Sequence, residues 1–137
     1  MSKILVNAWK CPDGTILESR HRHDFVSHVI PVNGAADKVY FVDGGTNYCR
    51  VSGEGIEFVG CYDTDPHEKI REVLSWGSYG RDGKQEKHYI LLKDLTDEHV
   101  DAILRTQSHI KDTPIEKVLK DEQEYRKVNK IVVKDGL

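Results

Sequence analysis

The sequence predicts an α+β fold: an N-terminal antiparallel β-sheet meander with one helix and a glycine-rich loop, then C-terminal helices packed on the sheet. In the first part of the chain, short β-type runs alternate with the turn signals P-D-G, N-G, D-G-G and S-G-E-G. Beyond Tyr62, apolar residues recur at helical spacing. The length of 137 residues suits one domain, which we expect to span residues 1–137.

β-branched and aromatic residues mark the strands of the meander. We expect these strands at residues 4–9, 16–30, 38–42, 48–51 and 56–62. The second run is long for one strand, so we expect it to be bulged or bent.

Capping signals predict the first helix. Asp65 can cap it, Pro66 fits its first position, and Glu68 follows three residues after the cap. We expect this helix to end at Trp76 and Gly77. A glycine-rich loop over residues 76–87 and a strand over residues 88–92 then follow.

Two further helices are expected near the end of the sequence. Thr96 caps the first, and acidic residues occupy its first turn. Thr113 caps the second, with Pro114 at its first helical position. The apolar residues at 131–133 predict a short final strand.

The composition narrows the classes of function. The formal net charge of −3 argues against binding along a long nucleic acid, so an anionic partner would be held by a few placed arginines. There is no run of 18 apolar residues, so we expect no membrane span and a cytosolic protein. The three cysteines are odd in number and widely spaced, which predicts neither disulfides nor a metal site.

The run S-R-H-R-H-D-F, which starts at residue 19, concentrates nitrogen-rich side chains. On a strand, His21, His23 and Phe25 would share one face, which we expect to turn inward or toward a partner subunit. The opposite face would carry the arginines and the aspartate: Arg20, Arg22 and Asp24. This row can bind an anion, can form a salt-bridged sheet surface, or can leave the histidine pair to hold a metal.

Two other stretches can hold a ligand. In V-D-G-G-T-N-Y-C-R, Tyr48 and Arg50 share one strand face and can hold a ring and a phosphate together, or support the sheet as a cross-strand pair. In the loop W-G-S-Y-G-R-D-G-K-Q, Trp76 or Tyr79 can stack on a nucleobase. The loop's polar candidates are Arg81 and Lys84 for phosphates and Gln85 for a base or ribose edge. Alternatively, Trp76 closes the core and the rest only connects two elements.

No common catalytic motif is present: the sequence lacks a Walker loop, G-x-S-x-G and H-E-x-x-H. We therefore expect ligand binding without catalysis, with no cofactor and no metal. Two alternatives stay open. One is a nucleotide or phosphodiester hydrolase that uses His21, His23 and Asp24, with or without a metal. The other is a host-takeover protein that binds a bacterial enzyme.

Five motifs occur in a fixed order: S-R-H-R-H-D-F, V-D-G-G-T-N-Y-C-R, D-P-H-E-K-I-R-E, W-G-S-Y-G-R-D-G and E-Q-E-Y-R-K. As a set, over roughly residues 12–128, they resemble a widespread family of small tailed-phage proteins. The layout of a sheet followed by helices also resembles the first type of Thoeris anti-defence proteins. Those proteins bind and sequester a cyclic ADP-ribose signal, and can also hold cyclic oligonucleotides.

This resemblance implies a sponge for a small nucleotide-type signal in the host cytoplasm, assembled as a homodimer or higher homo-oligomer. Arg20, Arg22 and Arg50 would meet a pyrophosphate, and Asp24 and Gln85 would bond ribose and base. The loop over residues 76–85 would be a lid, with Trp76 or Tyr79 stacking on adenine. The charged pair Glu86 and Lys87 departs from the neutral residue expected after such a lid.

Overall fold

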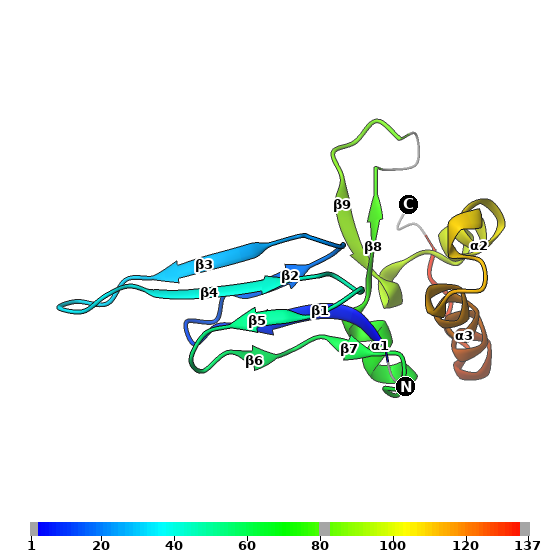
Figure 1. Cartoon of the computed structure of the whole chain (residues 1–137). Helices are drawn as coiled ribbons and strands as arrows, with labels where there is room; N and C mark the ends of the chain where they lie inside the picture. Colours follow the sequence, from blue (N-terminus) through cyan, green and yellow to red (C-terminus); the bar gives the residue numbers. More distant parts are fainter. Residues whose placement is uncertain (1–2, 80–82, 135–137) are drawn as a thin grey trace. The chain divides into compact units, whose positions relative to one another are not determined.

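The computed structural model describes residues 3–79 and 83–134. It confirms the α+β class, with antiparallel sheets in the N-terminal half and helices after them (Figure 1). The chain divides into two compact units, Met1–Thr64 and Asp65–Leu137, which we call unit 1 and unit 2. The single domain and the packing of the helices on the N-terminal sheet stay predictions.

Unit 1 contains two antiparallel sheets. In the first, β1 (Ile4–Lys10) pairs with β2 (Ile16–Ser19), β6 (Glu57–Phe58) and β7 (Cys61–Tyr62). In the second, β4 (Lys38–Asp43) lies between β3 (Val26–Ile30) and β5 (Arg50–Ser52). β3 and β4 run side by side as a hairpin (Figure 1).

The alternating pattern of β4 explains how the two sheets pack together. Tyr40 and Val42 point to one face and are fully buried, whereas Val39 and Phe41 point to the other. The buried pair packs with Cys11 and Leu17, which come from the first sheet and its β1–β2 connection. Burying a side chain of this size contributes about 1.5–3 kcal/mol, so these residues form the core of unit 1.

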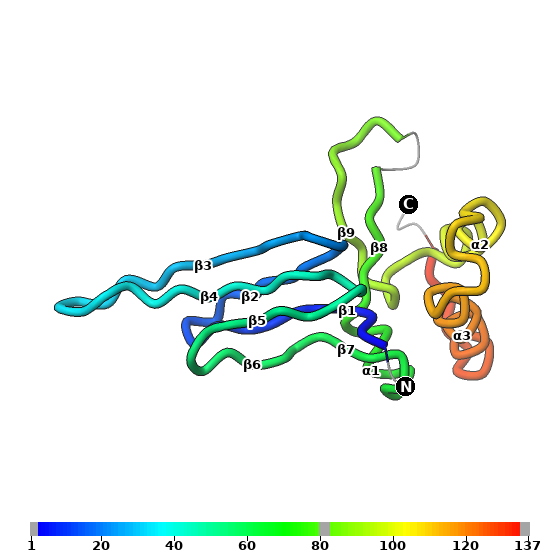
Figure 2. The backbone as a smooth tube through the Cα atoms, in the orientation of Figure 1, coloured from blue at the N-terminus to red at the C-terminus, as the bar shows by residue number. Residues whose placement is uncertain are grey.

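The predicted strand over residues 16–30 is broken in the structure. β2 ends at Ser19 and β3 begins at Val26, and the chain reverses between them (Figure 2). His23 has a φ of 63°, a left-handed conformation that no strand allows. The alternation of Arg20, Arg22 and Asp24 against the histidines is therefore wrong. The predicted strand over residues 56–62 is likewise divided into β6 and β7.

Unit 2 begins with α1 (His67–Val73), one residue later than a cap at Asp65 would give. Pro66 takes the N-cap position without a side-chain hydrogen bond, and the Asp65 carboxylate pairs instead with Lys69 at 3.3 Å. The helix is followed by β8 (Ser75–Ser78), which pairs with β9 (His88–Leu91). The predicted loop over residues 76–87 is thus wrong at its start, because Trp76 lies in a strand opposite Ile90.

The other helices begin where their caps predict. In α2 (Asp97–Thr106) the Thr96 hydroxyl accepts from the amide of His99 at 3.1 Å, and α3 (Pro114–Asn129) follows the Thr113 cap. Short 3-10 turns, η1 (Leu92–Asp94) and η2 (Ser108–Ile110), precede them. Residues 131–133 are not a strand. In the described ranges, no helix is long and apolar enough to span a membrane.

Candidate functional site

A turn occupies residues 20–25 and is held by its own polar groups. The Asp24 carboxylate accepts from the amide of Arg20 at 2.8 Å. The Ser19 hydroxyl donates to the carbonyl of Asp24 at 2.6 Å. Asp24 is therefore committed to shaping the turn, a role that the strand prediction missed.

The turn that follows β4 lies directly against this first turn. The amide of Gly45 donates to the Ser19 hydroxyl at 2.8 Å. Gly45 has a φ of 55°, and a Cβ atom there would lie 2.5 Å from the main chain of His21. Only glycine permits this approach without displacement. The motifs S-R-H-R-H-D-F and V-D-G-G-T-N-Y-C-R therefore form one structure, which we call the joined turns.

The Asn7 side chain of β1 forms hydrogen bonds with the main chain of the second turn. Its side chain is 1% exposed and donates to the carbonyls of Gly45 at 3.1 Å and Asp43 at 3.4 Å. Its own oxygen accepts from the Trp9 indole at 3.0 Å. A buried amide with satisfied partners fixes one conformation of the turn.

A buried carboxylate organises the outer side of the joined turns. Asp43 is 6% exposed, and its Oδ2 accepts from the Tyr48 hydroxyl at 3.3 Å and pairs with Arg50 Nε at 3.3 Å. Within the described part of the chain, Asp43 Oδ1 has no hydrogen-bond partner. Tyr48 and Arg50 thus come together as predicted, and Asp43 is the residue that joins them.

This arrangement favours one tautomer of His23. The Tyr48 hydroxyl proton points to Asp43, so the hydroxyl oxygen accepts from His23 Nδ1, 2.9 Å away. The neutral imidazole then carries its proton on Nδ1 and a lone pair on Nε2. His23 is exposed, and this second nitrogen is the one left for a further hydrogen bond.

An aromatic stack continues the same surface. Phe25 lies on Phe41 with ring centroids 5.1 Å apart and an interplanar angle of 27°. Arg50 lies over Phe41 at 5.6 Å from the ring centroid. Phe25 is 54% exposed, so it does not turn inward within the chain, and its facing a partner subunit stays a prediction. Phe41 thus contacts both the exposed Phe25 ring and the Arg50 guanidinium.

The remaining predicted residues of unit 1 lie around this platform, which we define as His23, Phe25, Phe41, Tyr48 and Arg50. Arg20 pairs with Glu18 at 2.9 Å. Arg22 is exposed, and its carbonyl accepts from His21 Nδ1 at 3.2 Å. Burial raises the pKa of Glu18, and the charge of Arg20 opposes that rise.

The other predicted residues belong to unit 2. Trp76 lines an apolar cavity of about 30 Å³ with Leu92 and Leu119, as expected of a side chain that closes a core. Tyr79 is exposed, and its carbonyl accepts from the amide of Gln85 at 2.8 Å. Arg81 lies outside the described residues. The structure thus brings Arg20, Asp24 and Arg50 into one local assembly and places Trp76, Tyr79 and Gln85 in another unit.

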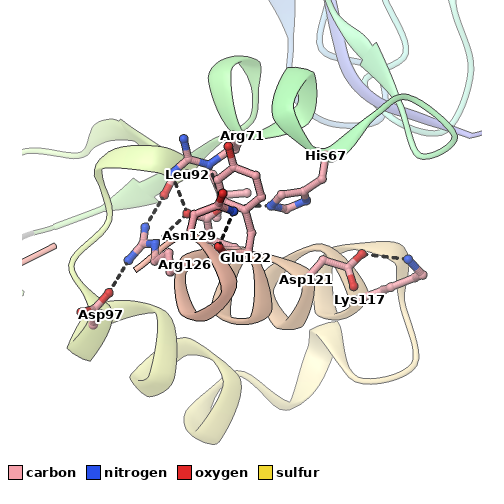
Figure 3. Close-up of polar contacts among 10 residues, drawn as sticks. His67, Arg71, Leu92, Asp97, Lys117, Asp121, Glu122, Arg126 and Asn129 are labelled. Atoms are coloured by element: carbon pink, nitrogen blue, oxygen red, sulfur yellow. Dashed lines mark hydrogen bonds and ion pairs between the residues drawn. The ribbon is translucent and has the colours of Figure 1, made fainter. Parts of the chain in front are cut away.

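Unit 2 contains a buried ionic cluster that joins two other motifs (Figure 3). Glu122 of α3 is 0% exposed and receives hydrogen bonds from Arg71 (Nε and Nη2, both 3.0 Å), His67 (Nε2, 2.9 Å) and Arg126 (Nε, 2.6 Å). Arg126 also donates to Asp97 at 2.8 Å and to the carbonyl of Leu92 at 2.9 Å. D-P-H-E-K-I-R-E and E-Q-E-Y-R-K are therefore two halves of one structural cluster.

The charges of this cluster satisfy one another. Burial by itself raises the pKa of Glu122, but hydrogen bonds from Arg71, Arg126 and His67 outweigh it and hold that pKa below its usual value. The same carboxylate raises the pKa of Arg71. Both oxygens of Glu122 are occupied, so this carboxylate has no open hydrogen-bonding position for a ligand.

Comparisons with known proteins give no relative. No protein-family model, no curated protein and no solved structure matches this chain. Among the described residues, no three histidine, cysteine or acidic side chains are grouped so that they could hold a metal ion.

Proposed function

We propose that this protein binds a small nucleotide-type signalling molecule on the platform of unit 1 and sequesters it without cleaving it. The observation that carries the proposal is the exposed Phe25 ring stacked on Phe41, together with the Arg50 guanidinium that lies over the Phe41 ring. In this proposal a nucleobase stacks on Phe25 and its phosphate meets Arg50. His23 and the exposed Arg22 lie in the adjoining turn.

The energetics support a ligand of this kind. Stacking of a base on an aromatic side chain is worth about 1–3 kcal/mol. A charge-assisted hydrogen bond to a guanidinium adds about 1.5–3 kcal/mol. Asp43 holds the Arg50 side chain in place before a ligand arrives, which lowers the entropic cost of binding.

The biological setting of the proposal rests on the resemblance of the motifs. We propose a phage anti-defence protein that acts in the host cytoplasm as a homodimer or higher homo-oligomer. Its ligand would be a cyclic ADP-ribose isomer or a cyclic oligonucleotide made as an immune signal. The platform supports the ligand class by its chemistry, and the host process is the part that needs a test in cells.

The first test is a thermal-shift titration against cyclic ADP-ribose isomers and cyclic di- and trinucleotides, followed by mass analysis of the ligand released on denaturation. A ligand at about 100 times its Kd should stabilise the protein by about 2.7 kcal/mol. Phe25→Ala should remove the shift. Val39→Ala is the matched control, because Val39 is 56% exposed on the same sheet. No shift with any compound contradicts the proposal.

The geometry of His23 supports a second candidate, a phosphodiester hydrolase. A carboxylate, a tyrosine hydroxyl and an imidazole in series orient Nε2 as a general base. This candidate requires cleaved ligand in the mass analysis and its loss in His23→Ala. Intact ligand from the wild type contradicts it and leaves sequestration.

A further inference from the structure

We infer that the platform selects a nucleotide whose phosphate carries one negative charge, a phosphodiester, over one with a terminal phosphate or a pyrophosphate. This inference rests on the proposed function and narrows its ligand class. It departs from the pyrophosphate that the sequence led us to expect. The reason is the charge built into the joined turns.

The joined turns and the strand that enters them hold as many carboxylates as arginines. The cations are Arg20, Arg22 and Arg50, and the anions are Glu18, Asp24 and Asp43. Glu18 pairs with Arg20 at 2.9 Å, and Asp43 pairs with Arg50 at 3.3 Å. With neutral histidines, the site therefore has no net positive charge to offer a dianion.

Burial strengthens this restriction at the centre of the platform. Asp43 is almost fully buried, so its charge is poorly screened by water and is felt by any anion that approaches Arg50. Arg50 uses Nε for Asp43, which leaves its terminal nitrogens as a two-pronged donor for a phosphate. One guanidinium of this kind matches the two non-bridging oxygens of a phosphodiester, which share one negative charge. A second negative charge would meet the Asp43 carboxylate, and two of the three arginines, Arg20 and Arg50, already pair with carboxylates.

The test uses two probes that share base, sugar and phosphate position: adenosine 5′-phosphate and its P-methyl ester. At about pH 8 the first is a dianion, because its second pKa is about 6, and the second is a monoanion. Calorimetric titration at low salt should show the methyl ester binding at least about fivefold more tightly, a difference of about 1 kcal/mol.

Glu18→Gln supplies the matched perturbation. It removes one carboxylate beside Arg20 and should improve the binding of adenosine 5′-phosphate. The ratio of the Kd of adenosine 5′-phosphate to the Kd of the methyl ester should therefore fall at least about threefold. Glu54→Gln is the control. Glu54 pairs with Lys38 at the opposite end of β4, roughly 17 Å along the strand from Asp43, and should leave the preference unchanged.

The outcomes separate this inference from the proposed function. Equal or tighter binding of adenosine 5′-phosphate overturns the inference and leaves nucleotide sequestration standing. Failure of both probes to bind also overturns it, while the cyclic-nucleotide titration judges the proposed function independently. An equal effect of Glu18→Gln and Glu54→Gln on the preference refutes the role given to the local carboxylates.

Discussion

Replacing Glu122 by glutamine should strongly destabilise unit 2. The substitution keeps the size of a side chain that is fully buried and removes its charge. Glutamine can accept through one oxygen, but its amide nitrogen would face the guanidinium of Arg71 or Arg126, both donors. The cluster would then hold buried cations with no central anion.

The structure sets the size of the effect. Removing one partner of a buried ion pair costs about 3–5 kcal/mol. Arg126 keeps Asp97 and the carbonyl of Leu92 after the change, so the lower end of this range applies. We expect a loss of about 3 kcal/mol in the free energy of unfolding. In a unit of this size that loss lowers the Tm by more than about 10 °C.

Urea and thermal unfolding monitored by circular dichroism give the measurement. Glu124→Gln is the matched control, because it makes the same change two residues along α3 at an exposed position. Its effect should stay within about 0.5 kcal/mol. A loss of less than about 1 kcal/mol in Glu122→Gln would refute the reasoning, because the cluster would then be contributing no more than a surface ion pair.

The same residue predicts a pH dependence. The pKa of Glu122 is lower in the folded protein than in the unfolded chain. Its contribution to stability is therefore fully present above the unfolded value and is lost as pH falls through the folded value. Wild-type stability should fall below about pH 4.5, the ordinary value of the carboxyl. Glu122→Gln should show a shallower fall, and parallel curves would contradict this assignment.

Three further predictions concern other parts of the chain. Gly45→Ala should separate the joined turns, because its Cβ would meet the main chain of His21, and it should lower the Tm and abolish ligand binding. Gly34→Ala is the control: Gly34 has a φ of 75° and open space around it, so the substitution should cost only backbone strain of about 1–3 kcal/mol. Tyr48→Phe should shift the neutral tautomer of His23 away from Nδ1–H, which nitrogen-15 NMR of the imidazole can measure, and an unchanged tautomer would refute the hydrogen-bond chain. Thr96→Ala should cost about 1 kcal/mol in urea unfolding through loss of a helix cap, and a neutral effect would contradict that role.

Local signals in the sequence were sufficient to predict much of the fold. The Thr96 and Thr113 caps placed two helix starts correctly, because each hydroxyl satisfies an amide of its own first turn. The change in apolar spacing after Tyr62 predicted strands before it and helices after it, but β8 was not predicted. The break after Ser19 was not predictable in this way, since it depends on Asp24 and on contacts with a turn more than 20 residues later.

The candidate site could be predicted only in part, because it too depends on contacts between residues far apart in the sequence. The sequence indicated Tyr48 and Arg50 as neighbours, and both meet at Asp43. It grouped Phe25 with His21 and His23 on one strand face, because a period of two was applied across a turn. The D-G-G of the second turn and the polar density of the first were the available signals that the chain bends in both places.

The structure also shows that the sequence motifs differ in what they can say about function. The two motifs that meet at Glu122 form their hydrogen bonds within unit 2. The Glu122 carboxylate is buried, and both of its oxygens accept hydrogen bonds. The two motifs that meet at Gly45 also contain a buried carboxylate, that of Asp43. This carboxylate contacts Tyr48 and Arg50 in the same surface region as the exposed Phe25. The hydrogen bonds of Glu122 all end on residues of unit 2, so they need no ligand to explain them. A carboxylate that positions exposed groups is better explained by a partner for those groups, so the joined turns are where a ligand should be sought.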